Sequence, residues 1–453
     1  MIFSRLIGST AAHRHARQSL AWLAIGVVAV IAGVRARAAD TSASLRIVGA
    51  SVGGNIQWTG GPSLGVLTIQ AAPSPKGPWI SDPSRYSTNA SGTAAVAPGA
   101  GRVYFRLFAA ETPPTAKGFT NLVSFYGVIE TIAGQGIGRS DLVNYWQPEF
   151  EGGPATIAAL SRPHHAMADA SDNVYIVDKN SHSILKVTPD GLIHTVAGTH
   201  EAGDNGDGPA PGTDLQLSYP NGLWVRPDGT VYILDTGNGK VRKLTPDGVM
   251  TTLFTVSNGI STGRGLYVND DESAVYFCSG SSLRQRVPGS ITTLNSKFTE
   301  LGNIAPDPLG GLLVTDRGNH SVYHVDVAGQ NAGNRTRIAG NGSTDPVVSG
   351  TPALNNGLAG IRGVWPVPSG GCLLATHEGS QLLFMDTSGI VYVLVEGLPG
   401  NAHSGDGMPF QDPSVLVSEC RSVSMDYRGN ILITENDFGF IRRVRFQQLP
   451  PGD

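Results

Sequence analysis

The sequence predicts an all-β protein, and three observations support that fold class. The chain of 453 residues contains 59 Gly and 29 Pro, which are spread between short apolar segments and therefore indicate many turns. A strand–turn–strand unit recurs six times, and the last unit lacks an outer strand that an isolated segment near residue 130 supplies. Together they predict a six-bladed β-propeller closed by an N-terminal outer strand, behind a small N-terminal β-sandwich.

The first 39 residues have the pattern of an export signal. Three arginines precede the apolar run from Leu20 to Val34, and a small-residue cleavage motif, Ala36-Arg37-Ala38, follows it. We predict a signal peptide over 1–39 with cleavage before Ala39, and hence a secreted or periplasmic protein without a membrane span. An uncleaved anchor is the alternative, but this run is short for a hydrocarbon core of about 30 Å.

Residues 40–112 predict a small β-sandwich. Short segments of alternating apolar and polar residues lie between turn-rich stretches, and Trp58 and Trp79 are its expected core residues. The arrangement resembles the fibronectin- or immunoglobulin-like modules of secreted bacterial proteins. Residues 113–117 predict a linker, because two prolines interrupt any strand ladder there.

The repeat follows the linker. Its clearest copies, residues 173–191 and 230–248, each contain a strand, a tight turn, a second strand and a Pro-Asp-Gly turn, which presets a hairpin. Second strands are expected at 173–178, 230–235, 274–277, 311–316, 372–376 and 430–435, and inner strands at 165–167, 222–225, 265–268, 303–305, 363–365 and 422–425. Four strands in each unit predict a propeller blade.

The two ends of the repeat complement each other. The last unit ends at residues 441–446 without an outer strand, whereas residues 127–134 form an outer strand with no unit before it. Pairing these ends would close a ring and remove two open sheet edges. We therefore predict that residues 118–447 form the propeller and that 448–453 form a tail.

The repeat motifs resemble those of the NHL-repeat family. They are Val-Tyr-Ile-Val-Asp178 with Asn180, Val-Tyr-Ile-Leu-Asp235 with Asn238, and Asp316-Arg-Gly-Asn. The resemblance covers residues 118–447, and the glycine-rich segments at 203–210 and 403–407 match the long connectors of that family. Ser279 and His377 stand where the family prefers Asp. The resemblance implies a six-bladed propeller; some such proteins are lyases that hold zinc through channel histidines, and the similar lactonases hold a divalent metal.

Composition restricts the partners. The formal net charge of −4 and the pI of about 6.3 argue against a nucleic-acid partner.

Cys278, Cys372 and Cys420 allow one disulfide at most, and each lies beside an apolar strand segment, so we expect buried thiols.

A ligand site is expected where the inner strands begin, around the mouth of the central channel. The residues at that position are His164, Asn221, Arg264, Gly302, Arg362 and Arg421. Three arginines around one mouth repel each other unless something screens them, so the ring suggests a site for a carboxylate, sulfate or phosphate group. The alternative is that each arginine pairs with a neighbouring acidic residue or carbonyl group and fills the channel.

The second strands end on the same side of the propeller. Asp178, Asp235 and Asp316 are expected to hold turns through backbone hydrogen bonds. His377 and Glu435 have no such explanation and join the candidate ligand-binding residues.

The motifs favour neither a metal nor a cofactor. A catalytic zinc needs about three protein ligands, whereas the ring offers only His164, and the adjacent His165 points to the other side of the strand. The acidic segment 204–208 lacks the spacing of an EF-hand loop. Walker-type phosphate-binding and Cys-x-x-Cys motifs are also missing from the sequence.

These observations lead to a functional hypothesis with two alternatives. We expect a scaffold that binds a protein or an acidic glycan at the channel mouth. The sequence assigns no catalytic residue and predicts no oligomeric state. One alternative is a lyase or lactone hydrolase acting on an anionic sugar or peptide derivative, with His164 or His377 as base and the arginines as carboxylate clamps. The other is a structural envelope component with no small ligand.

Overall fold

The computed structural model describes residues 28–29, 46–50, 55–60, 65–72, 80–87, 91–95, 104–111, 126–137, 140, 142–308, 310–367, 371–397, 399–400 and 403–446. Trp79, the linker 113–117, the tail 448–453 and nearly all of the predicted signal peptide 1–39 lie outside these residues. The predictions made for them stay predictions.

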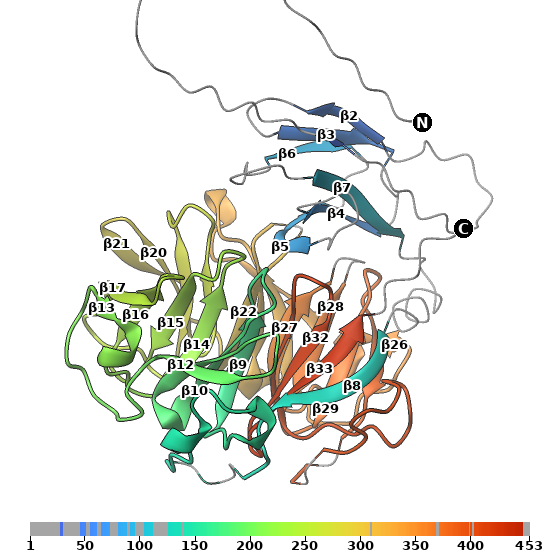
Figure 1. Ribbon diagram of the computed structural model, residues 1–453. Coiled ribbons are helices and arrows are strands. Elements are labelled where there is room, and N and C mark those ends of the chain that lie inside the picture. The colour runs from blue at the N-terminus through green and yellow to red at the C-terminus, as the bar shows by residue number, and fades with distance from the viewer. Residues whose placement is uncertain are drawn as a thin grey trace, which may run out of the picture.

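Two sheets are built from the N-terminal strands, which lie together at the top of Figure 1. The strands are β1 (Val28–Ala29), β2 (Arg46–Ala50), β3 (Asn55–Thr59), β4 (Gly65–Ala72), β5 (Ile80–Ser87), β6 (Gly92–Ala95) and β7 (Tyr104–Glu111). One sheet has the order β1-β7-β4-β5 and the other β2-β3-β6. Trp58 on β3 is buried, as expected, and so are Phe105 and Leu107 on β7.

The rest of the described chain forms six antiparallel sheets of four or five strands. Their strands are β9 (Pro163–Ala168), β10 (Val174–Asp178), β11 (Ser183–Val187), β12 (Ile193–Ala197); β13 (Ala210–Pro211), β14 (Pro220–Val225), β15 (Val231–Asp235), β16 (Lys240–Leu244), β17 (Val249–Thr255); β18 (Leu266–Val268), β19 (Val275–Ser279), β20 (Ser282–Val287), β21 (Ser290–Asn295); β22 (Leu301–Pro306), β23 (Leu312–Asp316), β24 (Ser321–Val325), β25 (Arg335–Ala339); β26 (Thr351–Pro352), β27 (Ile361–Pro366), β28 (Cys372–Thr376), β29 (Gln381–Met385), β30 (Ile390–Val395); and β31 (Cys420–Met425), β32 (Ile431–Glu435), β33 (Phe440–Phe446) with β8 (Tyr126–Ala133). The inner and second strands therefore occur where the repeat predicted them.

The helical segments of the described chain are short 3-10 turns in the connections. They are η1 (Pro148–Phe150), η2 (Ala155–Ile157), η3 (Lys179–Ser181), η4 (Gly212–Asp214), η5 (Arg317–Asn319), η6 (Gly329–Asn331) and η7 (Ala353–Asn355). None of the helices in the described part of the chain is long and apolar enough to cross a membrane.

The innermost strands of the six sheets are neighbours in sequence order. Strand β9 contacts β14, and contacts continue through β18, β22, β27 and β31 before returning from β31 to β9. Figure 1 shows the six sheets arranged around a common centre. Apart from β18 and the last residue of β19, these strands and the second strands beside them are buried throughout, because neighbouring sheets cover them on both faces.

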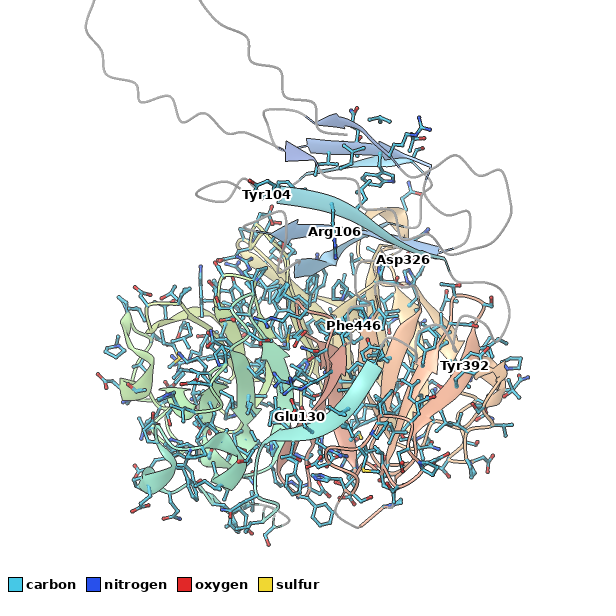
Figure 2. All side chains as sticks on the ribbon, turned by 45° about the vertical axis from the view of Figure 1, so that its right-hand side comes forward. Tyr104, Arg106, Glu130, Asp326, Tyr392 and Phe446 are labelled. Carbon is cyan, nitrogen blue, oxygen red and sulfur yellow. The ribbon has the colours of Figure 1, made fainter. Side chains whose placement is uncertain are left out.

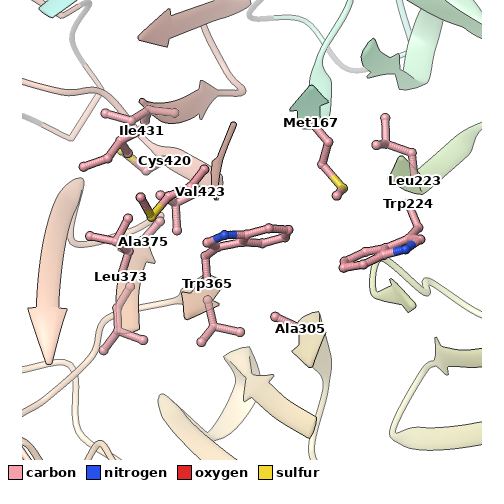
Figure 3. Close-up of a cluster of buried hydrophobic side chains, with 14 of the residues drawn as sticks. Met167, Leu223, Trp224, Ala305, Trp365, Leu373, Ala375, Cys420, Val423 and Ile431 are labelled. Carbon is pink, nitrogen blue, oxygen red and sulfur yellow. The ribbon is translucent and has the colours of Figure 1, made fainter. Parts of the chain in front are cut away.

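Large apolar side chains meet at the centre. Met167 of β9, Trp224 of β14 and Trp365 of β27 point toward one another in Figure 3 and are all buried. The rings of Trp224 and Trp365 lie 5.8 Å apart between centroids. Residues from three different sheets thus meet at the centre, so it is a packed core.

The sixth sheet joins distant parts of the chain. Strand β8 pairs antiparallel with β33, with Glu130 opposite Arg443 and Tyr126 opposite Phe446. Figure 2 shows Glu130 and Phe446 at this junction. The Glu130 carboxylate accepts hydrogen bonds from Arg443 at 2.8 Å and from Arg445 at 2.9 Å. The outer strand expected at 127–134 therefore completes the sheet of the last repeat.

All three cysteines are buried and none forms a disulfide. Burial raises the pKa of the Cys278 thiol to about 12 and that of Cys372 well above its usual range. They behave as small apolar side chains, as the sequence predicted.

Candidate functional site

The predicted ring residues are placed by β-bulges. In four inner strands the register with the second strand skips one residue, and the skipped residues are His164, Asn221, Arg362 and Arg421. A bulge leaves its extra residue outside the ladder and redirects the side chain. The same local irregularity thus sets equivalent residues at the same end of four neighbouring sheets.

The two remaining sheets depart from this pattern. In the fourth sheet the register skips both Gly302 and Asn303, and Thr315 opposite them donates from its hydroxyl to the Arg362 carbonyl at 2.9 Å. In the third sheet Arg264 lies two residues before β18 begins at Leu266. A side chain on Gly302 would collide with Thr315, since an added Cβ would lie 2.3 Å from its Oγ1.

His164 and Asn221 are joined across neighbouring sheets. The Oδ1 atom of Asn221 only accepts, so Nδ1–H of His164 donates to it. Burial and the charges of Arg421, Arg264 and Lys179 lower the pKa of His164 well below its usual range. His164 is therefore neutral at pH 7, and it is surrounded by positive charge.

Three arginines on one side of the site are paired with acidic and amide groups. Nη2 of Arg162 lies 2.8 Å from Asp437, and Nη2 of Arg421 donates to Asn436 and lies 3.6 Å from Asp437. Nη2 of Arg362 donates to Glu378 at 2.7 Å. Although burial opposes the shift, hydrogen bonding to His377 and nearby arginines hold the pKa values of Asp437 and Glu378 well below their usual range.

His377 lies within this paired group. Its Nε2 is 3.3 Å from Oδ1 of Asp437 and 3.2 Å from Nη2 of Arg421, and its Nδ1 is 3.6 Å from Glu378. One ring nitrogen cannot both accept from Arg421 and donate to Asp437, so the two contacts belong to different protonation states of Nε2. Burial lowers the pKa of His377, and its acidic neighbours oppose the shift.

Arg264 differs from the other arginines. Its Nε and Nη1 are buried and have no hydrogen-bond partner among the described residues. Burial, followed by the charges of Arg362 and Arg317, lowers its pKa well below the usual range. A guanidinium group stays charged in proteins, so this shift expresses the cost of holding an uncompensated cation in the site.

The site has an excess of positive charge. Arg162, Arg264, Arg317, Arg362 and Arg421 face the carboxylates of Glu300, Glu378 and Asp437, and Glu300 pairs with Arg317. Nε of Arg362 and Nε of Arg421 are also buried without a partner in the described chain. The alternative in which every arginine is fully paired therefore fails at Arg264.

Glu435 does not join this group. It is fully buried, and its carboxylate lies 2.6 Å from Nδ1 of His403 and accepts from the backbone amide of Ser418 at 3.3 Å. Asp178, Asp235 and Asp316 bind backbone amides in the same way, at Ser161, Ser218 and Thr299. The aspartates are structural, as predicted, but these hydrogen bonds hold the connector that precedes each inner strand, whereas the sequence predicted bonds within the turn that follows each aspartate.

One sequence alignment needs correction in the fifth sheet. Thr376 pairs with Ile361, as Asp178 pairs with Pro163, so Thr376 and not His377 takes the position of the aspartates. His377 lies one residue beyond the strand. The shift by one residue points its side chain toward Arg421 and Asp437, whereas the aspartates point toward the connector before the inner strand.

Sequence reasoning missed several members of the site. Arg162 lies two residues before His164, Glu378 follows His377, and Asp437 lies two residues after Glu435. Each is close in sequence to a candidate that was identified, but in a turn whose direction the strand pattern does not specify. A signal was available for Glu378 and Asp437, because each carries its charge two residues beyond the end of a second strand.

The donors of the site fit an anion. In the described part of the chain, no three His, Cys, Asp or Glu side chains gather as a metal ion would require. Guanidinium groups only donate hydrogen bonds and bind planar oxyanions in pairs. The chemistry that these residues support is recognition of carboxylate, sulfate or phosphate oxygens.

No protein-family model and no curated protein matches this chain. Among solved structures, a protein of unknown function from Bacteroides thetaiotaomicron aligns with a TM-score of 0.55 at 13% identity, covering 86% of this chain and 93% of its own. An auxiliary nutrient binding protein from Bacteroides ovatus aligns with a TM-score of 0.53 at 12% identity, covering 87% and 95%. A streptogramin B lyase reaches 0.46 at 12% identity, covering 72% and 99%. The first two likenesses show the fold, which is nearly all-β and β-propeller-like.

Proposed function

We propose that this chain is an exported six-bladed propeller of the NHL type that binds an anionic ligand at the mouth formed by its inner strands. The ligand class that we favour is an acidic glycan, free or carried on a protein, whose carboxylate or sulfate group meets the arginines. The observation that carries the proposal is Arg264, a buried cation with two unpartnered donor atoms. An anion would supply both the missing charge and the missing hydrogen bonds.

The polar groups around the arginines support a sugar acid in particular. Asn221 and His164 come from adjacent sheets, and Glu378 and Asp437 approach from the other side. Amide, imidazole and carboxylate groups exchange hydrogen bonds with hydroxyls, whereas guanidinium groups bind the acid. A uronate or sulfated sugar carries both kinds of group.

Two contacts support six blades in a closed ring. The inner strands contact one another in a cycle that returns from β31 to β9. Strand β8 then supplies the outermost strand of the last sheet by pairing with β33. A closed ring would bring the six inner-strand starts around one mouth, which is where the arginines lie.

One similar structure supports a binding role. The Bacteroides ovatus protein is called an auxiliary nutrient binding protein, and it aligns over 87% of this chain. The signal sequence and the N-terminal β-sandwich predicted from the sequence fit the same role. The sandwich would act as a spacer or as a second contact with a partner.

A second candidate function is an enzyme that acts on an anionic sugar or peptide derivative. The observation in its favour is His377, whose Nε2 can accept from Arg421 or donate to Asp437. A neutral histidine held between a cation and a carboxylate can move a proton, while the arginines hold the acid of the substrate. Product formation that disappears in His377→Gln, with ligand affinity retained, would favour this function.

Calorimetric titration of the chain beginning at Ala39 tests the binding proposal. We expect glucuronate, a sulfated monosaccharide or phosphate to bind and neutral glucose to bind at least about tenfold more weakly, because only the acids satisfy Arg264. Arg264→Gln should reduce the affinity for the acids at least about tenfold, since it removes the uncompensated charge.

Arg337→Gln is the matched control, because Arg337 is exposed on the outer strand β25. It should leave affinity unchanged at fixed ionic strength. The proposal fails when none of the acids binds, or when Arg264→Gln and Arg337→Gln bind them as the unmodified chain does.

A further inference from the structure

The pair between Arg362 and Glu378 is asymmetric in its exposure. The Arg362 side chain is 6% exposed and the Glu378 side chain 50%, with 2.7 Å between Nη2 and Oε1. The guanidinium group is therefore fixed in the site, whereas the carboxylate borders on solvent. A carboxylate that leaves such a pair recovers its hydration, so another anion can replace it at small cost.

Gly360 makes the space that Glu378 occupies. Its φ is +60°, and an added Cβ would lie 0.8 Å from Oε2 of Glu378. The carboxylate thus lies directly against a backbone that carries no side chain. The contacts that hold it among the described residues come from Arg362 and His377. The glycine therefore leaves room for a carboxylate beside Arg362 that any larger residue at position 360 would take away.

Glu378 also acts on Arg264. Its negative charge raises the pKa of Arg264, while the charge of Arg362 lowers it, so the three groups lie within electrostatic reach of one another. An anion that replaced Glu378 would meet the freed Nη2 of Arg362 and would lie within electrostatic reach of Arg264, whose Nε and Nη1 have no partner among the described residues. A larger ligand acid could therefore use the positive charge of Arg264 as well as that of Arg362.

We propose that the Glu378 carboxylate occupies the place that an acidic group of the ligand takes on Arg362, and that Glu378 is the residue that sets the affinity and selectivity of the site. This inference rests on the proposed function. Ligands that can engage Arg264 as well as Arg362 displace Glu378, whereas small acids that engage only Arg362 do not. Glu378 thereby restricts the site to ligands that can also engage Arg264.

The test is titration of Glu378→Gln with glucuronate, inorganic sulfate and acetate at fixed ionic strength. The amide keeps the shape of the side chain at a half-exposed position, so the chain should fold. We expect glucuronate and sulfate to bind at least about tenfold more tightly than to the unmodified chain, and acetate to gain detectable binding. Adding Arg264→Gln to this variant should remove the gain for glucuronate and sulfate.

Glu272→Gln is the matched control. Glu272 also pairs with a cation, Lys243 at 2.6 Å, but lies in the turn between β18 and β19, at the opposite end of those strands from Arg264. It should not change the affinity for any of the three anions. Equal binding to Glu378→Gln and to the unmodified chain would overturn the role of Glu378 and leave the proposed function standing. Failure of all the anions to bind to either chain would overturn both.

Discussion

His165 shows how much a single buried residue can cost. It is 2% exposed, and neither Nδ1 nor Nε2 has a hydrogen-bond partner in the described chain. Burial lowers its pKa to about 4. The ring is therefore neutral in the folded protein and titrates near pH 6.5 when unfolded. Between these values the unfolded chain binds more protons, so stability falls as pH falls.

The expected size of this effect follows from the pKa difference. His165 should contribute a loss of roughly 3 kcal/mol between pH 6.5 and pH 4, and none of the change above pH 7. His165→Leu should remove this part of the pH dependence. Urea unfolding of both chains at pH 7 and pH 5 measures it, and the same loss of stability in both chains would show that His165 stays paired or hydrated.

The sequence aligned equivalent positions of four inner strands. His164, Asn221, Arg362 and Arg421 could be aligned because each comes directly before the apolar run of its inner strand, and the structure finds each of them at a bulge. Their role in ligand binding stays a prediction. The spacing of residues in the sequence does not show in which direction each side chain points. Glu435 follows the same rule as the aspartates and turns toward His403, whereas His377, one residue beyond Thr376, turns toward Arg421.

At the scale of elements, buried arginines hold strands and connectors together through ion pairs. Arg242 on β16 is fully buried and donates to Asp235 on β15 at 3.1 Å, and it reaches Asp204 at 3.1 Å and the Gly206 carbonyl at 2.7 Å in the preceding connector. Arg442 on β33 binds Asp406 in the same way, at 2.8 Å. The acidic segment 204–208, which lacks the spacing of an EF-hand loop, thus supplies acceptors for arginine, and Asp406 does the same in the other connector.

Arg242→Met should destabilise the protein by about 3–5 kcal/mol, because it leaves Asp235 buried without its cation. Adding Asp235→Asn should recover part of this loss, since the amide needs no counter-charge. The free energy of unfolding in urea measures both variants. Arg337→Met, at an exposed position, should change stability by less than about 0.5 kcal/mol, and a similarly small effect of Arg242→Met would refute the role given to that pair.

Elements were predictable where turn chemistry and apolar runs agree. The Pro-Asp-Gly turns at 189–191 and 246–248 separate β11 from β12 and β16 from β17, as expected. The short 3-10 turns and the paired segments β13 and β26 were not predicted, because their two or three residues carry no periodicity. The bulges were also invisible, since a skipped residue leaves the apolar pattern nearly unchanged.

At the scale of the whole molecule, the last sheet depends on β8. A chain that begins at residue 118 keeps β8, whereas one that begins at residue 138 lacks it and exposes the edge of β33. The first should unfold cooperatively and bind the same anions as the longer chain. The second should aggregate or unfold at a lower temperature, because an open edge pairs with other chains.

Size-exclusion chromatography and thermal unfolding of the two shortened chains decide this. Equal stability of both would mean that β8 is dispensable and would count against a ring closed by that strand. Loss of binding in the chain that begins at 118 would instead assign part of the ligand site to the N-terminal strands.

The pairing of β8 with β33 also depends on the order in which the ribosome makes the two strands. Glu130 and Arg443 are separated by 313 positions along the chain. At synthesis rates of 5–20 residues per second, roughly 15–60 s pass between the appearance of the two strands. Throughout that interval β8 has no native partner. The nascent chain must therefore be kept from pairing through β8 with other chains until β33 has been made.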